Sequence, residues 1–445
     1  MCRNDRGAYQ GRNCAWGEGV AADHLDKRRS LSSRRWVVFC LCAALFICSQ
    51  FYRVSNAIIA PQLQRDLDLS PESLGFLTAL FFYTFAVVQL PLGPCLDRIG
   101  ARRSMAALTI VGSVGAWIFA SAKGLEGAAL GRVLLGAGMA ANLMGSMKLF
   151  TTWFSPREFA TLSGLIIALG TIGNMAAATP LALLVETVGW RWSFAIIGVL
   201  TALLAIVFYA FVREGPYSTV QDRKEDTFSI FEMARTLLGR RDYWIISLST
   251  FLRYGIFVAI QGLWVGPYLM EVVGLSAVQA GNLLLILNVG LIIGSPLSGW
   301  ISDRVLSSRK KVVMAGLVGM GLSLLVLAMG WASGNSSLLA GVLFTFGLSA
   351  GAGIVMYAHI KELMPKAMTG VALTGVNLFT MLGGGFFLHF MGWVLEQSGG
   401  RQTLPPEAYR TTFLLGVAGI MSAFCLYLFT REETSTYFLD LPQSH

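Results

Sequence analysis

Charged residues are scarce in this sequence. Only 13% of its 445 residues are Asp, Glu, Lys or Arg, whereas 55% are hydrophobic and the mean hydropathy is +0.62. Soluble domains carry roughly 25% charged residues, so the composition excludes a water-soluble globular protein and indicates an integral membrane protein. The apolar runs are continuous, which excludes the alternating strands of about ten residues that build a membrane β-barrel.

Several functional signatures are also missing. No Gly-rich loop ending in Lys and Ser or Thr is present, and the loops leave no room for a nucleotide-hydrolysing domain, so an ATP-driven pump is excluded. No clustered set of His, Asp and Glu with metal-ligand spacing and no nucleophile motif occurs, so we expect no enzymatic activity, no cofactor and no metal. None of the seven cysteines falls in a predicted outer loop, so no disulfide framework is implied.

What the sequence does contain is about twelve apolar runs of about 20 residues, the length that an α-helix needs to cross roughly 30 Å of hydrocarbon. They begin near Trp36, Pro71, Ser104, Leu125, Phe159, Arg191, Tyr243, Leu275, Val312, Ser337, Thr369 and Thr411. With a cytoplasmic amino terminus, about 25 of the 34 basic residues lie in cytoplasmic segments, as the positive-inside rule requires. We therefore predict an all-α integral membrane protein with twelve transmembrane helices and both termini cytoplasmic. The same asymmetry accounts for most of the net charge of +9, so no nucleic-acid partner is expected.

The chain also contains an internal repeat. GPCLDRIGARR, from Gly93 to Arg103, is matched about 206 positions later by GWISDRVLSSRKK, from Gly299 to Lys311, and repeats at a fixed offset indicate duplicated units. The predicted organisation is a disordered cytoplasmic tail at 1–35, an N-terminal six-helix bundle at 36–212, a cytoplasmic linker at 213–242, a C-terminal six-helix bundle at 243–430 and a cytoplasmic tail at 431–445.

Two motifs carry a family resemblance. The chain has a glycine, Asp-Arg, glycine and basic pattern after the second predicted helix, and RVLLGAG from Arg132 to Gly138 in the fourth. Together with twelve helices in two halves, these motifs resemble the major facilitator superfamily over nearly the whole chain. The resemblance implies alternating access, and it implies that the loop and its second copy help to hold the inner side closed. The gating residues so implied are Gly93, Asp97, Arg98, Gly100, Arg103, Asp303 and Arg304. The alternative is that the basic residues serve only to fix topology, and the second copy departs from the pattern because no Gly lies between Arg304 and Arg309.

Charged residues inside the predicted helices indicate the kind of solute. Arg53 and Arg253 fall near the midplane of the first and seventh helices, and no Asp or Glu lies more than about two turns inside any helix. Intramembrane charges mark substrate paths, and a buried Arg without a carboxylate partner costs several kcal/mol. Because Arg presents a planar fork of donors that fits a carboxylate or phosphate, we predict a small anionic solute. The pair also resembles, more weakly, the organophosphate and anion exchangers of the superfamily, although Arg53 aligns with Ala259 in the repeat and not with Arg253.

Polar residues near the two arginines are further candidates for substrate contact. They are Gln50, Asn56, Gln261, Tyr254 and Asn377. For each of them taken alone, a hydrogen bond between helices is the favoured alternative.

Two residues are candidates for ion coupling. Arg132 could couple transport or brace the first helix, and His389 could carry a proton or simply pack. With no embedded carboxylate, exchange against another anion is favoured over carboxylate-based proton symport.

Other readings of the same fold remain open at this stage. They are export of amphipathic compounds, dipeptide transport, and a transporter-like ligand sensor. We expect a monomer in the lipid bilayer of a bacterial inner membrane, although Asn335-Ser336-Ser337 is a formal glycosylation acceptor that leaves a eukaryotic source open.

Overall fold

The computed structural model describes residues 34–214, 235–332, 334–364, 368–399 and 404–432. Nearly all of the two predicted tails and most of the predicted linker lie outside these residues. Within them every regular element is helical. The first half contains the helix Arg34–Val54, α2 (Asn56–Leu67), α3 (Pro71–Arg98), α4 (Ala101–Ala120), α5 (Leu125–Met139), α6 (Ala141–Trp153), α7 (Pro156–Ala176) and α8 (Thr179–Phe211). The second half contains α10 (Arg241–Ala259), η1 (Ile260–Trp264), α11 (Val265–Pro267), η2 (Tyr268–Val272), α12 (Ala277–Trp300), η3 (Ile301–Val305), α13 (Arg309–Ala328), α14 (Ser336–Ala350), α15 (Gly353–Leu363), α16 (Thr369–Gly399) and α17 (Pro406–Tyr427).

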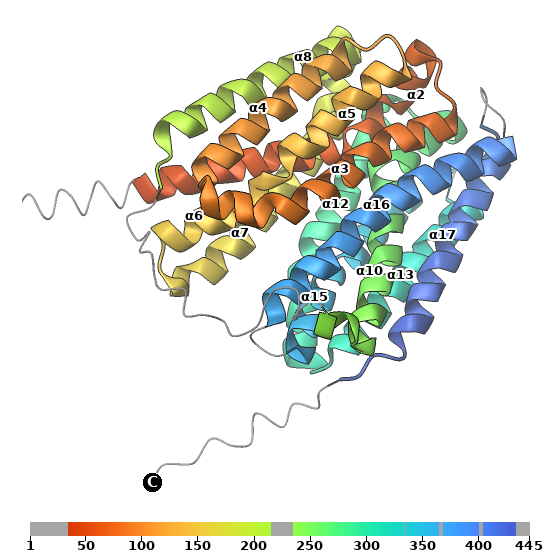
Figure 1. Ribbon diagram of the computed structural model, residues 1–445. Coiled ribbons are helices and arrows are strands. Elements are labelled where there is room, and N and C mark those ends of the chain that lie inside the picture. Colours follow the sequence, from red (N-terminus) through yellow and green to blue (C-terminus); the bar gives the residue numbers. More distant parts are fainter. Residues whose placement is uncertain (1–33, 215–234, 333, 365–367, 400–403, 433–445) are drawn as a thin grey trace, which may run out of the picture.

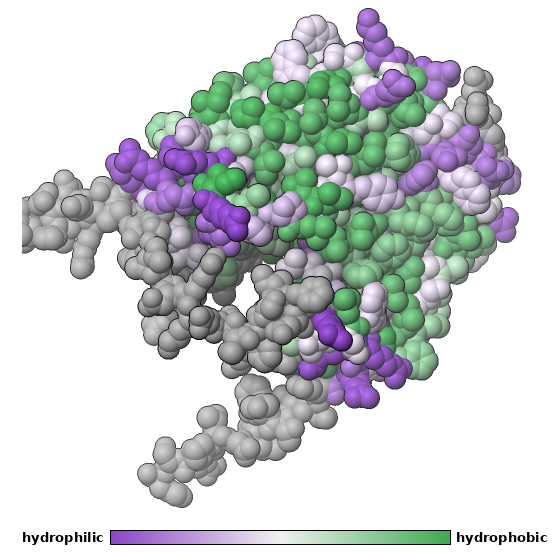
Figure 2. Space-filling model, in the orientation of Figure 1, coloured by the Kyte–Doolittle hydropathy of each residue, from purple (hydrophilic) through white to green (hydrophobic). Residues whose placement is uncertain are grey.

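Eleven helices of the described chain are long and apolar enough to cross a membrane. The longest, Thr161–Phe211, has 51 residues and is interrupted at Gly189, whose φ of 78° is not helical. At 1.5 Å per residue it covers about 77 Å, more than twice the hydrocarbon core. Figure 2 shows a broad hydrophobic surface with hydrophilic residues gathered at the ends of the bundles, as a membrane protein requires.

The predicted repeat is visible in the backbone. Asp68, with φ of 49°, ends α2, and 206 positions later Gly274, with φ of 78°, follows η2. Ser70 and Ser276, again 206 positions apart, each cap the next long helix by accepting a hydrogen bond from a first-turn N–H. A Ser side chain at this position satisfies a donor that has no partner within the helix. The two halves therefore fold in the same local order.

The halves meet along α3 and α16, which run side by side through the centre of Figure 1. We call the end where α8 finishes and α10 begins the linker side, and the opposite end the far side. At the far side the backbones of α2 and α11 approach so closely that a Cβ at Gly266 would lie 2.0 Å from the Ala57 oxygen. Thr179 also donates across the seam to Asn282 there, at 2.7 Å. Toward the linker side the ribbons of the two halves diverge (Figure 1), whereas these contacts join the halves at the far side.

Candidate functional site

Arg53 lies at the end of the first helix and reaches across to the other half. Its side chain is buried, with 9% exposed, and its Nη1 donates to the Tyr254 hydroxyl of α10 at 3.2 Å. The guanidinium carbon lies 5.1 Å from the ring centre of Phe85 and 5.9 Å from that of Phe82, a distance at which an aromatic ring attracts a cation. The buried Nε atom has no hydrogen-bond partner within the described chain.

Arg253 lies one residue before Tyr254 and is also buried, with 5% exposed. Its Nη1 donates to the Ala350 carbonyl at the end of α14, at 3.0 Å, and its buried Nε has no partner among the described groups. Space for the guanidinium comes from Gly353, because a Cβ there would lie 2.1 Å from Nη2. The residue 206 positions after Arg53 is Ala259, at the end of α10, so Arg253 sits about 9 Å nearer the linker side than a symmetric partner would.

Two tyrosines and two amides connect this pair of arginines. Tyr357 of α15 lies one turn along the helix from Gly353, the glycine that makes space for the Arg253 guanidinium. Its hydroxyl donates to Asn377 Oδ1 at 3.4 Å, and Asn377 Nδ2 donates across the seam to Gln89 Oε1 of α3 at 2.9 Å. The structure therefore brings Arg53, Arg253, Tyr254 and Asn377 into one polar cluster that spans both halves. Among the described residues no carboxylate forms an ion pair with either arginine.

Other predicted neighbours have partners within their own half. Asn56 donates to Thr78 at 2.8 Å, and Gln261 donates to Asn288 at 2.7 Å, so both amides join neighbouring helices, the packing alternative named above. Gln50 packs against the glycines of α7, and its buried Oε1 has no partner in the described structure. It therefore retains a free acceptor.

Sequence reasoning missed two polar residues near the cluster. Gln89 is the lone amide in an apolar stretch of α3, and Asn174 lies in α7 with a buried Oδ1 that has no partner among the described groups. Both could have been found as isolated amides within apolar runs, although neither is charged or close in sequence to Arg53 or Arg253.

Arg132 is enclosed within the first half. Its Nη1 donates to the Tyr52 carbonyl at 3.1 Å, and its guanidinium lies 5.3 Å from the Phe81 ring centre and 5.9 Å from that of Phe119. It therefore holds the first helix at the turn that presents Arg53, as the bracing alternative expects.

His389 lies apart from the arginines. It sits on the seam of α3 and α16, where its ring centre is 5.3 Å from that of Phe76 and its Nε2 is 3.7 Å from a Glu72 oxygen. A coupling role for either Arg132 or His389 stays a prediction.

The predicted gating residues lie at the linker side. Asp97 pairs with Lys148 of α6, and Asp303 pairs with Arg309. Both pairs stay within one half and do not cross the seam. Gly93 faces open space, and Arg98, Arg103 and Arg304 are exposed.

Gly100 has a conformational reason to be glycine, because it precedes α4 with φ of 93°, a region that costs other residues energy. The second copy lacks this glycine but keeps a left-handed turn, since Ser307 has φ of 46°. The second copy of the loop thus makes its left-handed turn with a strained serine in place of the missing glycine.

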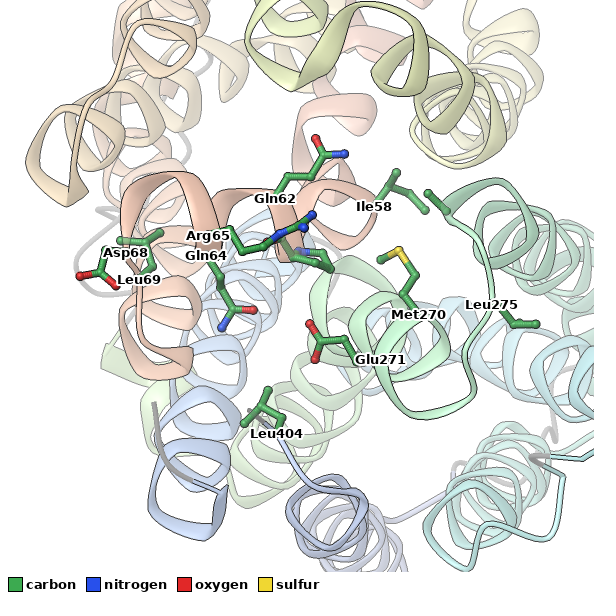
Figure 3. A pocket seen from close by; sticks show the side chains of 12 residues that line it. Ile58, Gln62, Gln64, Arg65, Asp68, Leu69, Met270, Glu271, Leu275 and Leu404 are labelled. Atoms are coloured by element: carbon green, nitrogen blue, oxygen red, sulfur yellow. The ribbon is translucent and has the colours of Figure 1, made fainter. Parts of the chain in front are cut away.

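A cavity of about 810 Å³ opens at the far side, between α2 and η2. Figure 3 shows Arg65 of the first half and Glu271 of the second half projecting into it. Neither Arg53 nor Arg253 lines this cavity. This far-side cavity is therefore separate from the arginine cluster.

Two apolar helical bundles that pack together along α3 and α16 have the architecture of a multi-pass membrane protein. The chain belongs to the Major Facilitator Superfamily, whose family model matches residues 39–305 and 246–443. It is 25% identical over 316 residues to the hexuronate transporter of Escherichia coli K12, covering 66% of this chain and 72% of that protein. It is 22% identical over 427 residues to the probable galactarate/D-glucarate transporter GudP of Escherichia coli K12, covering 85% and 90% respectively.

A solved structure of the same fold is similar over nearly the whole chain. This is a bacterial homologue of the human lysosomal transporter Spinster in an inward-facing, unoccupied conformation. It matches with a TM-score of 0.76 at 17% identity, covering 89% of this chain and 97% of that one. The predicted superfamily is confirmed, and with its bacterial relatives the chain is a multi-pass bacterial membrane protein.

Proposed function

We propose that this protein is a secondary active transporter of a small organic anion, and that its substrates are sugar acids such as hexuronates. The observation that carries the proposal is the cluster of Arg53, which reaches across the seam to Tyr254, and the adjacent Arg253, both buried and without an acidic partner among the described residues. Relatives named for hexuronate and for galactarate/D-glucarate transport support the same substrate class.

The chemistry of the cluster fits a hydroxylated carboxylate. A buried cation without a counterion costs several kcal/mol, and a bound carboxylate offsets that cost through charge-assisted hydrogen bonds to the guanidinium forks. The free acceptors on Gln50 and Asn174 suit the hydroxyl donors of a sugar acid. A phosphate group fits this cluster less well, because Arg253 lies about 9 Å along the helix axis from the position that corresponds to Arg53 in the repeat.

Transport follows from alternating access around this cluster. We take the linker side to be cytoplasmic from the distribution of basic residues, and the far side, where α2 and α11 are in close contact, to be the outer side. Thr161–Phe211 supplies two crossings that Gly189 separates, which gives twelve in all. We expect transport to be coupled to exchange against another anion. We also expect the protein to function as a monomer.

Ligand-dependent thermal stability of the purified wild-type protein tests the proposal. The panel is D-glucuronate, galactarate, D-glucose, glucose 6-phosphate and inorganic phosphate at one pH. The acids should raise the unfolding temperature, because a ligand at a hundredfold excess over its Kd stabilises the native state by about 2.7 kcal/mol. Equal stabilisation by D-glucose, which carries no charge, would contradict a substrate site that selects anions. Stabilisation by the two phosphates alone would favour the organophosphate exchangers.

A further inference from the structure

Three titratable side chains from both halves meet on the far-side seam. Glu72 occupies the first turn of α3, and His389 and Glu396 lie two turns apart on α16. The Glu72 and His389 side chains are 41% and 36% exposed, so neither is sealed within the helix packing. The group lies apart from the arginine cluster and is not used by the proposed substrate site.

The two halves contact each other reciprocally at this point. A Glu396 oxygen accepts a hydrogen bond from the Glu72 backbone N–H at 3.1 Å, so a carboxylate of one half caps the N-terminus of a helix in the other. Such helix ends carry unpaired donors and a partial positive charge. In return, a Glu72 oxygen lies 3.7 Å from His389 Nε2. A Cβ at Gly392 would lie 2.5 Å from the Pro71 oxygen, so these contacts need α3 and α16 to be closed on each other.

The charge of the imidazole decides how strong this contact is. Facing it are the Glu72 carboxylate from α3, the Phe76 ring from α3 and, two turns along its own helix, Glu396. With a neutral imidazole the contact between His389 and Glu72 carries no ion pair, and with a protonated imidazole it becomes an ion pair across the seam. Histidine changes charge in the physiological pH range. Because the ion pair exists only while the seam is closed, a proton on His389 favours the far-side-closed state.

We propose that Glu72, His389 and Glu396 form a proton-sensitive latch that holds the far side closed. The latch makes these three residues positioning residues for alternating access, and acidity on the far side shifts the protein toward the linker-side-open state. The inference rests on the alternating-access part of the proposed function and is independent of the substrate.

Spin-label distances between the halves test the latch without any ligand. Labels on Lys123→Cys and Ser337→Cys, both exposed at the far side, would be introduced into a variant whose seven native cysteines have been replaced. The protein would be measured in nanodiscs between pH 8 and pH 5.5. The ratio of far-side-closed to far-side-open populations should rise about three- to fivefold on acidification, the effect expected for one half-exposed ion pair.

Variants at His389 separate a charge switch from simple packing. His389→Gln should give the high-pH ratio at every pH, and His389→Lys should give the low-pH ratio at every pH. Glu72→Gln, in the other half, should also abolish the pH response. Glu407→Gln removes an exposed carboxylate in the first turn of α17, away from this contact, and should respond like the parent.

Two outcomes would overturn the latch. One is a pH response that persists in His389→Gln or Glu72→Gln. The other is the same population ratio in the Gln and Lys variants of His389, which would show that only the shape of the side chain matters. Because the readout is a distance in the ligand-free protein, failure here leaves the substrate proposal standing, and failure of the substrate proposal leaves this test valid.

Discussion

Replacing Arg253 by glutamine should change ligand affinity and ligand-free stability in opposite senses. Arg253 is buried, donates to the Ala350 carbonyl at 3.0 Å and leaves its Nε without a partner within the described chain. Glutamine carries no charge and is too short to reach that carbonyl. The ligand-free protein should therefore be as stable as the wild type or more stable, because a buried unpaired cation is a cost that the substitution removes.

The loss of affinity follows from the hydrogen bond that the ligand loses. A hydrogen bond to a charged group contributes about 1.5–3 kcal/mol, and about 1.4 kcal/mol corresponds to a tenfold change in Kd. Arg253→Gln should thus raise the Kd for a sugar acid about 10- to 150-fold. Arg253→Lys keeps the charge but loses the planar fork, so its Kd should lie between those of the wild type and Arg253→Gln. Arg53→Gln should act in the same direction, with an added loss at the Tyr254 contact.

Thermal unfolding with and without D-glucuronate measures both quantities on one sample. Arg410→Gln, an exposed arginine on α17, serves as the matched control and should leave both values unchanged. The reasoning is refuted if Arg253→Gln and Arg53→Gln retain wild-type affinity. It is equally refuted if both ligand-free variants lose stability, because the arginines would then be structural.

Three further predictions concern the frame around the site. The Ser155 backbone N–H and hydroxyl lower the pKa of the Glu158 carboxyl. The Glu158 carboxylate therefore adds its full stabilisation of the fold above the pKa that it has in the unfolded chain. This stabilisation is lost as the pH falls through the lower pKa that it has in the folded protein. Glu158→Gln should cost about 0.5–1 kcal/mol at pH 7 and nothing at pH 3, measured by thermal unfolding; an equal cost at both pH values would contradict this. Gly266→Val should block far-side closure because its Cβ would lie 2.0 Å from a backbone oxygen of α2, and wild-type flux in liposomes would contradict that. Gly100→Ala should cost about 1–2 kcal/mol from its φ of 93°, whereas Gly93→Ala, with no atom within 4 Å of its Cβ, should be neutral; equal unfolding temperatures for the two would disprove the strain.

Much of the helical architecture could be predicted from the sequence, because a bilayer requires long apolar helices. Hydropathy placed Arg53 and Arg253 deep in the first and seventh apolar runs, and the repeat offset predicted that they would not be symmetric. The structure reproduces that offset at Ser70 and Ser276. A helix must satisfy its own backbone in hydrocarbon, so long apolar runs leave little freedom in local structure.

The partners of polar side chains were not accessible, because helix neighbours depend on tertiary packing. Asn56 and Gln261 were expected near the solute, but each has a partner on an adjacent helix of its own half. For His389 the sequence indicates no partner, yet Glu72, 317 positions away, faces it across the seam. Nothing in a single sequence specifies contacts between the two halves at that separation.

Solute counterflow in proteoliposomes tests the central claim most directly. Vesicles loaded with unlabelled D-glucuronate should take up external labelled D-glucuronate transiently above equilibrium, vesicles loaded with D-glucose should not, and Arg53→Gln together with Arg253→Gln should abolish the uptake. Counterflow driven equally well by D-glucose, or retained by the double variant, would contradict a substrate site built on these two arginines.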